Sequence, residues 1–189
     1  FKEGNVVPLK RDYNYLFLLA FTSVFLYQFG YMFGMQKTAA SDASLIIGFN
    51  PVSVSILSVL FLSHSLTRNG VIGIFLSFTG VVLIFLASPN VDIDFSDRLV
   101  GNAYIMFGAF AYAIYVVAMR RYVLLVKDNP LSSLATISWA SLIGCFLFVP
   151  FVINESPWDR EWGSQEWLLI AYLGVFSTAL CYVFFGMGV

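Results

Sequence analysis

Residues Gln36–Pro89 read QKTAASDASLIIGFNPVSVSILSVLFLSHSLTRNGVIGIFLSFTGVVLIFLASP, and the fold class follows most directly from this stretch. It contains two apolar runs, Ala40–Ser63 and Asn69–Ser88. A helix needs about 20 apolar residues to cross a bilayer core, so each run is long enough. The apolar residues are continuous and do not alternate with polar ones, which argues against membrane-spanning strands. The stretch therefore predicts two transmembrane helices.

The same pattern continues on both sides of this stretch and gives six apolar runs in all. No Lys, Arg, Asp or Glu lies in the core of any run, and the connections are short. We therefore expect an all-α polytopic membrane protein, folded as a helical bundle. The last run is still apolar where the chain stops, so we expect an internal piece of a longer protein. The six runs are Tyr13–Met35, Ala40–Ser63, Asn69–Ser88, Leu99–Met119, Leu131–Ile153 and Glu166–Val189.

The composition supports the membrane class and excludes several others. Of the 189 residues, 59% are hydrophobic and 11% are charged, with a mean hydropathy of +0.83. Soluble domains carry about 25% charged residues, so a soluble enzyme, a nucleic-acid-binding domain and a disordered linker are excluded. One His and two Cys are too few for a His/Cys metal site or a disulfide framework. We expect no catalytic residues, no metal and no cofactor. The expected partners are the lipid bilayer and a small-molecule solute, without nucleic acid.

The charges between the runs predict the orientation of the chain. When the connections are assigned alternately to two sides, seven basic residues lie on one side and three on the other. Basic residues concentrate in short cytoplasmic loops, so we expect the Phe1–Asp12 loop to be cytoplasmic. The expected location is the plasma (inner) membrane. Lys37, Asp42 and Arg98 are then counted as loop charges on the opposite side. The seven cytoplasmic residues are Lys2, Lys10, Arg11, Arg68, Arg120, Arg121 and Lys127.

Polar and aromatic side chains within the runs are the candidate solute-binding residues, because a polar group at membrane depth needs a partner or water. We expect them to act by hydrogen bonding and aromatic stacking. Pro51 should interrupt its helix near mid-membrane, which is typical of a transporter site, although a simple kink is the alternative. No acid lies deep in any run, which favours a neutral, zwitterionic or aromatic solute. The candidates are Gln28, Tyr31, Asn50, Tyr112, Tyr115, Trp139 and Tyr182.

Small residues recur at helical spacing in several runs. Gly73, Ser77 and Gly80 share one face of the third run, and Ala109 and Ala113 share one face of the fourth. Small residues let helix backbones approach each other in lipid. Close packing around a transport pathway and ordinary bundle packing both fit this spacing.

An offset of 151 residues aligns the first run with the last and indicates an internal repeat. Duplicated architecture of this kind is common in transporters. The aligned identities are Leu18 with Leu169, Ala20 with Ala171, Val24 with Val175, Phe25 with Phe176, Tyr31 with Tyr182 and Phe33 with Phe184.

An ordered set of motifs runs through Gln36–Pro89: small residues open a helix, a proline lies in mid-helix, Leu-Thr follows, and glycines are spaced along the next helix. These motifs are Thr38–Ser41, Ala43–Ile46, Pro51, Leu66, Thr67, Gly73, Gly80 and Val81. The stretch thereby resembles the EamA-type repeat of the drug/metabolite transporter superfamily. His64 departs from the pattern, because the family usually has Glu there. The second half resembles the start of the next repeat at Gly101–Ala103 and Trp167–Tyr182.

The resemblance implies ten helices in two inverted five-helix repeats, of which helices three to eight are visible here. Residues 1–90 would hold the last three helices of the first repeat, 91–98 an outer loop, and 99–189 the first three helices of the second repeat. Both termini of such proteins are cytoplasmic. The predicted fold class is therefore an inverted-repeat helical bundle with six of ten transmembrane helices present.

The sequence thus predicts a permease, and no enzyme, that moves a small organic solute such as an amino acid or similar metabolite outward by alternating access. A homodimer is an alternative to a monomer. A sugar-phosphate or nucleotide-sugar exchanger of the same superfamily would need Lys or Arg facing the cavity. A non-transporting membrane scaffold would have all its deep polar residues paired with one another. An intramembrane enzyme would need catalytic groups within the bilayer, which these runs do not supply.

Overall fold

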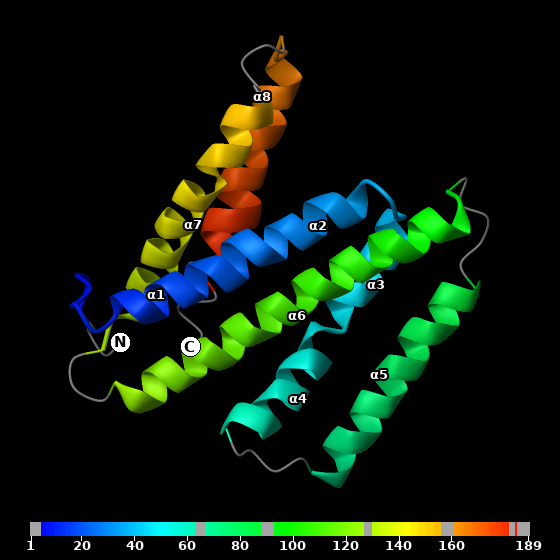
Figure 1. Ribbon diagram of the computed structural model, residues 1–189, viewed down its shortest axis with the longest axis horizontal. Helices are drawn as coiled ribbons and strands as arrows, with labels where there is room; N and C mark the ends of the chain where they lie inside the picture. Colours follow the sequence, from blue (N-terminus) through cyan, green and yellow to red (C-terminus); the bar gives the residue numbers. More distant parts are fainter. Residues whose placement is uncertain are drawn as a thin grey trace. The chain divides into compact units, whose positions relative to one another are not determined.

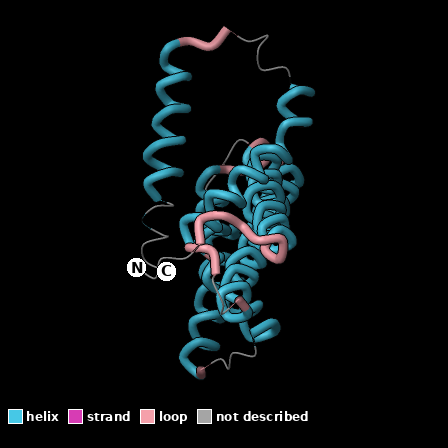
Figure 2. Tube along the Cα trace, turned by 90° about the vertical axis from the view of Figure 1, so that its left-hand side faces the viewer, coloured by secondary structure: helices cyan, strands magenta, loops and turns pink. Residues whose placement is uncertain are grey.

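The computed structural model describes residues 5–62, 67–87, 93–126, 130–155, 161–181 and 184, and these residues are almost entirely helical (Figure 1, Figure 2). The β pairing among them is an isolated bridge between Asn5 and Leu131. The predicted all-α fold is confirmed. In chain order the helices are α1 (Tyr13–Ala20), η1 (Phe21–Leu26), α2 (Tyr27–Met35), α3 (Ala40–Gly48), α4 (Asn50–Leu62), α5 (Arg68–Ala87), α6 (Phe95–Leu125), α7 (Ser133–Glu155), α8 (Ser164–Tyr172) and η3 (Leu173–Leu180).

Within the described ranges, four spans are long and apolar enough to cross a membrane, which confirms the polytopic membrane class. They correspond to the first, second, fourth and fifth predicted runs. The third run forms α5, a continuous helix of 20 residues. The sixth run is helical through α8 and η3, and residues 182, 183 and 185–189, which include Tyr182, lie outside the described residues. The four spans are Tyr13–Met35, Ala40–Leu62, Phe95–Leu125 and Ser133–Glu155.

Large apolar side chains cover the outside of these helices. Leu60 and Leu76 are each 70% exposed, and Phe75 is 69% exposed. Apolar surface left in water costs roughly 25 cal/mol per Å², so a chain with this much of it is stabilised by a lipid surrounding. The exposed side chains therefore agree with the membrane class.

Helix α6 is longer than its predicted run, Leu99–Met119. It has 31 residues and is therefore about 46 Å long, which exceeds a bilayer core of about 30 Å. Asp94 stabilises its start: the carboxylate accepts a hydrogen bond from the Ser96 hydroxyl at 2.6 Å, and the carbonyl accepts one from the Arg98 N–H at 2.9 Å. Arg98 was predicted to lie in the outer loop, and that assignment was wrong because the helix begins one turn earlier.

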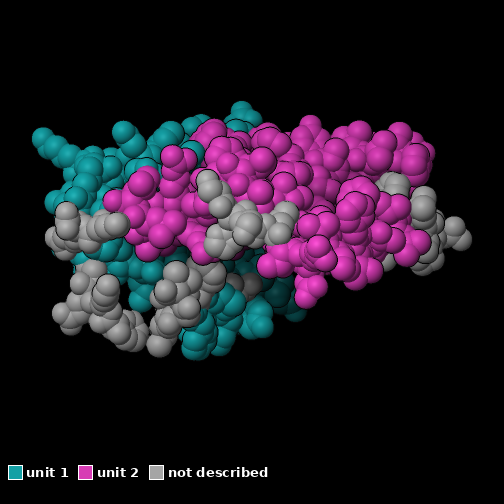
Figure 3. Space-filling view, turned by 90° about the horizontal axis from the view of Figure 1, so that it is seen from below, with its two compact units in different colours: residues 1–20, 126–189 teal, residues 21–125 magenta. Residues whose placement is uncertain are grey.

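The chain divides into two compact units (Figure 3). One unit comprises Phe21–Leu125 and is called the α2–α6 unit below; the other comprises Phe1–Ala20 with Val126–Val189 and is called the α1–α7 unit. These boundaries differ from the predicted repeat boundary at residues 91–98. The assignment of the chain to two repeats therefore stays a prediction.

Helix α6 packs against α2, α3 and α4 within the α2–α6 unit (Figure 1). Glycines bring the α2 and α6 backbones into direct contact. A Cβ added to Gly30 would lie 2.6 Å from the Tyr104 carbonyl oxygen, and one added to Gly34 would lie 2.8 Å from the Gly101 carbonyl oxygen. Gly30 and Gly34 are four residues apart, the spacing that lets helices approach closely in lipid. This pair was not among the small-residue faces predicted from the sequence.

An apolar layer joins α3 to α6 beside this contact. Ala43 and Ile46 of α3 pack with Ile105 and Ala109 of α6, and all four are buried. Met35 covers the layer from α2. Small side chains at two of the four positions let the helix axes lie close together.

Helix α5 has no buried side chain among its described residues and is linked to α4 and α3 by few contacts. One of these is an edge-on contact between the Phe49 and Phe78 rings, whose centroids are 6.3 Å apart. A Cβ added to Gly73 or Gly80 would meet nothing within 4 Å. The two glycines of the small-residue face predicted on this run therefore make no close helix contact among the described residues.

In the α1–α7 unit, α1 packs against α7. The segment before α1 is held to the start of α7 by backbone hydrogen bonds, from Asn5 N–H to the Pro130 carbonyl at 2.9 Å and from Ser132 N–H to the Asn5 carbonyl at 3.1 Å. Leu16 and Leu19 on α1 are fully buried. These contacts fix the N-terminal residues of the chain against a helix that begins more than a hundred residues later.

Two helical stretches, η1 and η3, have the wider π geometry. Under the 151-residue offset, η1 corresponds to residues 172–177, which overlap η3. A π segment is rare and is found mostly at functional positions. The internal repeat itself stays a prediction.

Candidate functional site

The predicted interruption lies between α3 and α4. Helix α3 ends at Gly48, Phe49 has a turn conformation with φ −79° and ψ −7°, and α4 starts at Asn50. Pro51 is the second residue of α4, and it has no N–H to continue the hydrogen-bond ladder of the preceding helix. The break lies near the middle of the span Ala40–Leu62. The role of Pro51 in shaping it stays a prediction, which removal of the proline would test.

Two buried oxygen atoms follow this interruption and have no hydrogen-bond partner among the described residues. They are Asn50 Oδ1 and Ser53 Oγ, and Ser53 is fully buried. The two residues are three positions apart, so they share one face of α4. An unpaired buried polar group costs about 1–3 kcal/mol. Ser55, two residues further along, instead donates a hydrogen bond to the Pro51 carbonyl at 2.7 Å.

Three of the predicted site residues lie in one row of tyrosine rings in the α2–α6 unit. The centroid of the Tyr27 ring is 6.3 Å from that of Tyr31 and 5.4 Å from that of Tyr112. Tyr112 in turn lies 5.6 Å from Tyr115, which is buried. The row therefore connects α2 with α6, and Tyr27 joins the three predicted residues.

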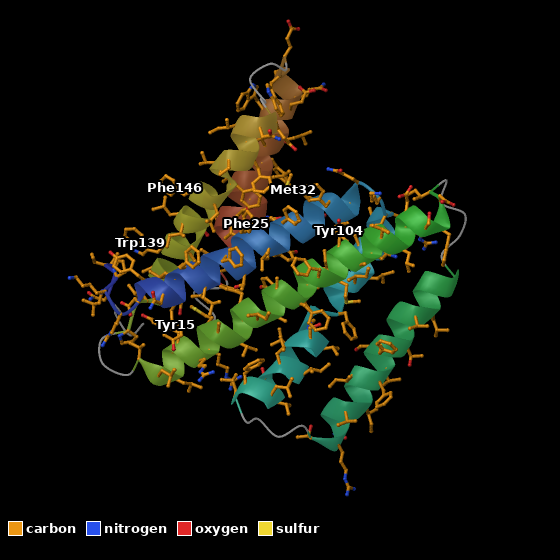
Figure 4. All side chains as sticks on the ribbon, in the orientation of Figure 1. Tyr15, Phe25, Met32, Tyr104, Trp139 and Phe146 are labelled. Carbon is orange, nitrogen blue, oxygen red and sulfur yellow. The ribbon has the colours of Figure 1, made fainter. Side chains whose placement is uncertain are left out.

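The other predicted residues do not belong to this row. Gln28 is exposed on α2, and Asn50 lies on α4. Trp139 lies on α7 in the α1–α7 unit, where its indole N–H donates a hydrogen bond to the Val6 carbonyl at 3.0 Å (Figure 4). Tyr182 lies outside the described residues. The structure thus brings three of the seven candidates together, and the binding role of all seven stays a proposal.

A second polar site, which the sequence did not reveal, joins the start of α3 to the start of α6. We call it the Asp42 cluster; its members are Thr38, Asp42, Arg98 and Asn102. Arg98 donates two hydrogen bonds to Asp42, from Nε to Oδ2 at 2.6 Å and from Nη2 to Oδ1 at 2.9 Å. Asn102 Nδ2 donates to the same Oδ2 at 3.2 Å, and the Thr38 hydroxyl donates to Asn102 Oδ1.

All four members of the Asp42 cluster are buried; Asp42 is 3% exposed and Arg98 is 9% exposed. The two-point contact between a guanidinium and a carboxylate is the strongest form of ion pair. Asp42 lies in the first turn of α3, where the helix dipole also favours a negative charge. Counting Asp42 and Arg98 as loop charges was therefore wrong, since both are buried in helices. The four-residue spacing of Arg98 and Asn102 is the signal that could have placed them on one helix face.

An exposed ion pair lies next to the Asp42 cluster. Lys37 Nζ is 2.9 Å from Asp97 Oδ1, and both side chains are about half exposed. The hydrogen bond to Asp97, with the attraction of its charge, raises the pKa of Lys37 above its ordinary value. The pair links the α2–α3 connection to α6, as the Asp42 cluster does.

Within the ranges that the structure describes, no group of three or more His, Cys, Asp or Glu side chains is placed to hold a metal ion. His64 lies outside those ranges. The described side chains therefore offer hydrogen bonding from α4, aromatic stacking between α2 and α6, and ion pairing between α3 and α6.

Comparisons with known proteins show the family of the chain. The model of the EamA-like transporter family matches residues 1–86 and 99–189. Among curated proteins, the chain is 26% identical over 190 residues to the uncharacterized transporter YetK and 28% identical over 197 residues to the uncharacterized transporter YyaM, both of Bacillus subtilis (strain 168). It is 30% identical over 175 residues to an uncharacterized transporter of Archaeoglobus fulgidus. No solved structure matches.

These alignments cover the whole chain for the two Bacillus proteins and 92% of it for the Archaeoglobus protein. They cover 56%, 61% and 58% of the respective relatives. The chain therefore spans a little over half the length of the curated relatives it matches.

Proposed function

The chain belongs to the EamA-like transporter family, and on that premise we propose that it is part of a permease that exports a small organic solute, such as an amino acid or similar metabolite, by alternating access. The family and its relatives support transport across a membrane. The solute class, the outward direction and the alternation are our proposal. No step of this mechanism needs covalent chemistry.

The observation that carries the proposal is the pair of unpartnered oxygens on α4. Asn50 Oδ1 and Ser53 Oγ are buried beside a helix interruption and have no partner among the described residues. In a membrane, a polar group of this kind needs a partner in the protein or a water-filled cavity. A solute with N–H or O–H donors would supply the missing hydrogen bonds.

The tyrosine row gives a second means of recognition. Tyr31, Tyr112 and Tyr115 present aromatic rings that an apolar or aromatic part of a solute could stack against. We propose that these three residues, with Gln28, Asn50, Trp139 and Tyr182, bind the solute, and that Pro51 shapes the helix that presents Asn50. Alternating access would then be a rocking of the two repeats around the site.

Two alternative functions fit the described residues less well. A phosphate-bearing solute would need a cationic side chain that is available for binding. Arg98 is a buried cation in the α2–α6 unit, but Asp42 already neutralises it through two hydrogen bonds. A passive scaffold would have its buried polar groups paired, whereas Asn50 and Ser53 are not paired with any described residue.

The test is efflux of labelled amino acids from vesicles that contain the full-length protein. Alanine replacements at Gln28, Asn50 and Tyr182 should each reduce efflux, because each removes a proposed contact with the solute. Leu60→Ala is the matched control on α4, since the Leu60 side chain is exposed on the outside of the helix. If all three replacements left efflux unchanged, the assignment of the binding site would be wrong. If the native protein moved none of the labelled solutes, the proposed solute class would be wrong.

A further inference from the structure

We propose that the Asp42 cluster is a latch that holds α3 closed on α6 at the non-cytoplasmic end of these helices and that separates when solute passes on that side. This inference rests on the proposed transport function. Asp42 and Arg98 act here as positioning residues, because they control the distance between two helices and are not among the residues proposed to bind solute.

The cluster lies at one end of both helices. Asp42 is in the first turn of α3, and Arg98 and Asn102 are in the first two turns of α6. Thr38 belongs to the connection between α2 and α3. The distribution of basic residues among the loops predicts that this end faces away from the cytoplasm. The hydrogen bonds of the cluster therefore tie the α2–α3 connection and α3 to α6 at the predicted outer surface.

The contact is tightly closed in the structure. A Cβ added to Gly101 would lie 2.8 Å from the Lys37 carbonyl carbon and 2.9 Å from Thr38 Cβ, so the connection lies directly on α6. The exposed Lys37–Asp97 pair adds a second link between the same two segments. No solute could pass between them without their separation.

The chemistry of the cluster suits a reversible contact. Its charged groups lie within two turns of the helix ends, where water can hydrate them once they separate. The next layer inward, which includes Ala43 and Ile105, is apolar and gains nothing from water. Asp42 keeps the favourable dipole of the α3 N-terminus in the open state, whereas Arg98 lies at a helix N-terminus that disfavours its charge. The charge of Arg98 is therefore more stable beside the carboxylate of Asp42 than apart from it, which favours re-formation of the contact.

The test measures from which side water reaches α4. Ser53→Cys is introduced into the full-length protein with Cys145→Ser and Cys181→Ser, and the protein is placed in vesicles of either orientation. The probe is a membrane-impermeant methanethiosulfonate that carries a quaternary ammonium group. Its rate of reaction with the introduced thiol is compared for the native cluster, Asp42→Asn, Arg98→Lys and the exchanged pair Asp42→Arg with Arg98→Asp. Glu155→Gln is the matched control, because it removes an exposed carboxylate at the end of α7.

We expect Asp42→Asn to raise the rate from the outer side about tenfold and to lower it from the cytoplasmic side, because breaking the latch shifts the population toward the outward-open state. Arg98→Lys keeps the charge but loses the two-point contact, so its effect should have the same direction and be smaller. The exchanged pair should return both rates toward those of the native cluster, and Glu155→Gln should change neither.

An equal rise in the reaction rate from both sides would overturn the latch proposal, since it would show a general loosening of the fold. Unchanged rates in Asp42→Asn and Arg98→Lys, with the introduced thiol reactive in the native cluster, would also overturn it and leave the transport function standing. A thiol at position 53 that reacts from neither side in any variant would contradict both the latch and the proposed function. A variant that does not fold is recognised by its elution in gel filtration, and Arg98→Lys then decides the outcome.

Discussion

The span Ala40–Leu62 has buried polar atoms both at its start and in its middle, and the two groups differ in their hydrogen bonding. At the start, both carboxylate oxygens of Asp42 accept hydrogen bonds from α6. In the middle, Asn50 Oδ1 and Ser53 Oγ have no partner among the described residues. The first arrangement stabilises a helix contact, whereas the second leaves hydrogen-bonding capacity unused. We infer that the start of this span holds the protein together and that its middle is available to a ligand.

The largest expected effect on stability is at the start of the span, where the carboxylate of Asp42 is hydrogen-bonded. Asp42→Leu should lower the free energy of unfolding by about 3–5 kcal/mol, because it removes the carboxylate that accepts two hydrogen bonds from the buried Arg98. The double variant Asp42→Leu with Arg98→Met should recover most of this loss, since apolar side chains can replace a buried pair at little cost. Thermal unfolding in detergent measures both. A single variant as stable as the native protein would show that Arg98 does not depend on Asp42.

The next effect concerns the backbone contact beside the cluster. Gly34→Leu should cost about 1–3 kcal/mol, because any side chain there must displace Ile105 or the α6 backbone. Gly73→Leu is the matched control on α5, where an added Cβ meets nothing within 4 Å. The two melting temperatures should therefore differ clearly. Equal losses in the two variants would mean that α2 and α6 are not as close as described.

A smaller effect, with opposite signs for stability and transport, is expected in the middle of the span. Ser53→Ala removes an unpaired hydroxyl, so stability should stay the same or rise by about 1 kcal/mol. Efflux of the transported solute should fall, because the solute loses a hydrogen-bond partner. Ser55→Ala is the control, since the Ser55 hydroxyl is already paired with the Pro51 carbonyl. Lower stability in Ser53→Ala would show that the hydroxyl has a structural partner and would remove the contrast between the two regions.

The smallest effect is expected at the exposed Lys37–Asp97 pair. The pKa of Lys37 is raised above its ordinary value of 10.5 by the hydrogen bond to Asp97 and the attraction of its charge. A raised pKa means that the stabilisation is complete below the ordinary pKa and is lost as the pH rises through the raised one. Lys37→Gln should therefore lower the melting temperature slightly at neutral pH, and the difference should vanish in strongly alkaline buffer or in high salt. A difference that persists in alkali would show that the charge is not its cause.

Much of the fold could be predicted from the sequence because hydropathy reports directly on lipid contact. The runs beginning at Tyr13 and Ala40 become spans with those starting points. Helix α3 ends and α4 begins next to Asn50 and Pro51, where the interruption was expected. A proline in an apolar run does not by itself interrupt a helix, since Pro150 lies within the continuous helix α7, and the role of Pro51 stays a prediction. The tyrosines on α2 and α6 could be chosen by helical spacing, although only three of the seven candidates fall in one row.

The Asp42 cluster could not be found in this way, because hydropathy treats every charge at the edge of a run as a loop charge. Arg98 lies in a helix that starts at Phe95, and its burial depends on a carboxylate 56 residues earlier in the chain. The spacing of Gly73 and Gly80 predicted a packing face, but the close helix contact is at Gly30 and Gly34, which also have helical spacing. Which glycines meet another helix is set by tertiary packing, and spacing alone does not report it.

The most direct test of the account is the reactivity of the Ser53→Cys variant of the full-length protein that also carries Cys145→Ser and Cys181→Ser, because both of those cysteines are exposed. If α4 faces a solute path that opens alternately to the two sides, the impermeant thiol reagent should reach the introduced cysteine from either side. A transported solute should slow the reaction by occupying the same place. In the Leu60→Cys variant on the same background, the introduced thiol lies on the outer face of α4 toward lipid, so the impermeant reagent should not react with it, with or without solute. A thiol at position 53 that stays unreactive from both sides, or that reacts without protection by any transported solute, would contradict the account.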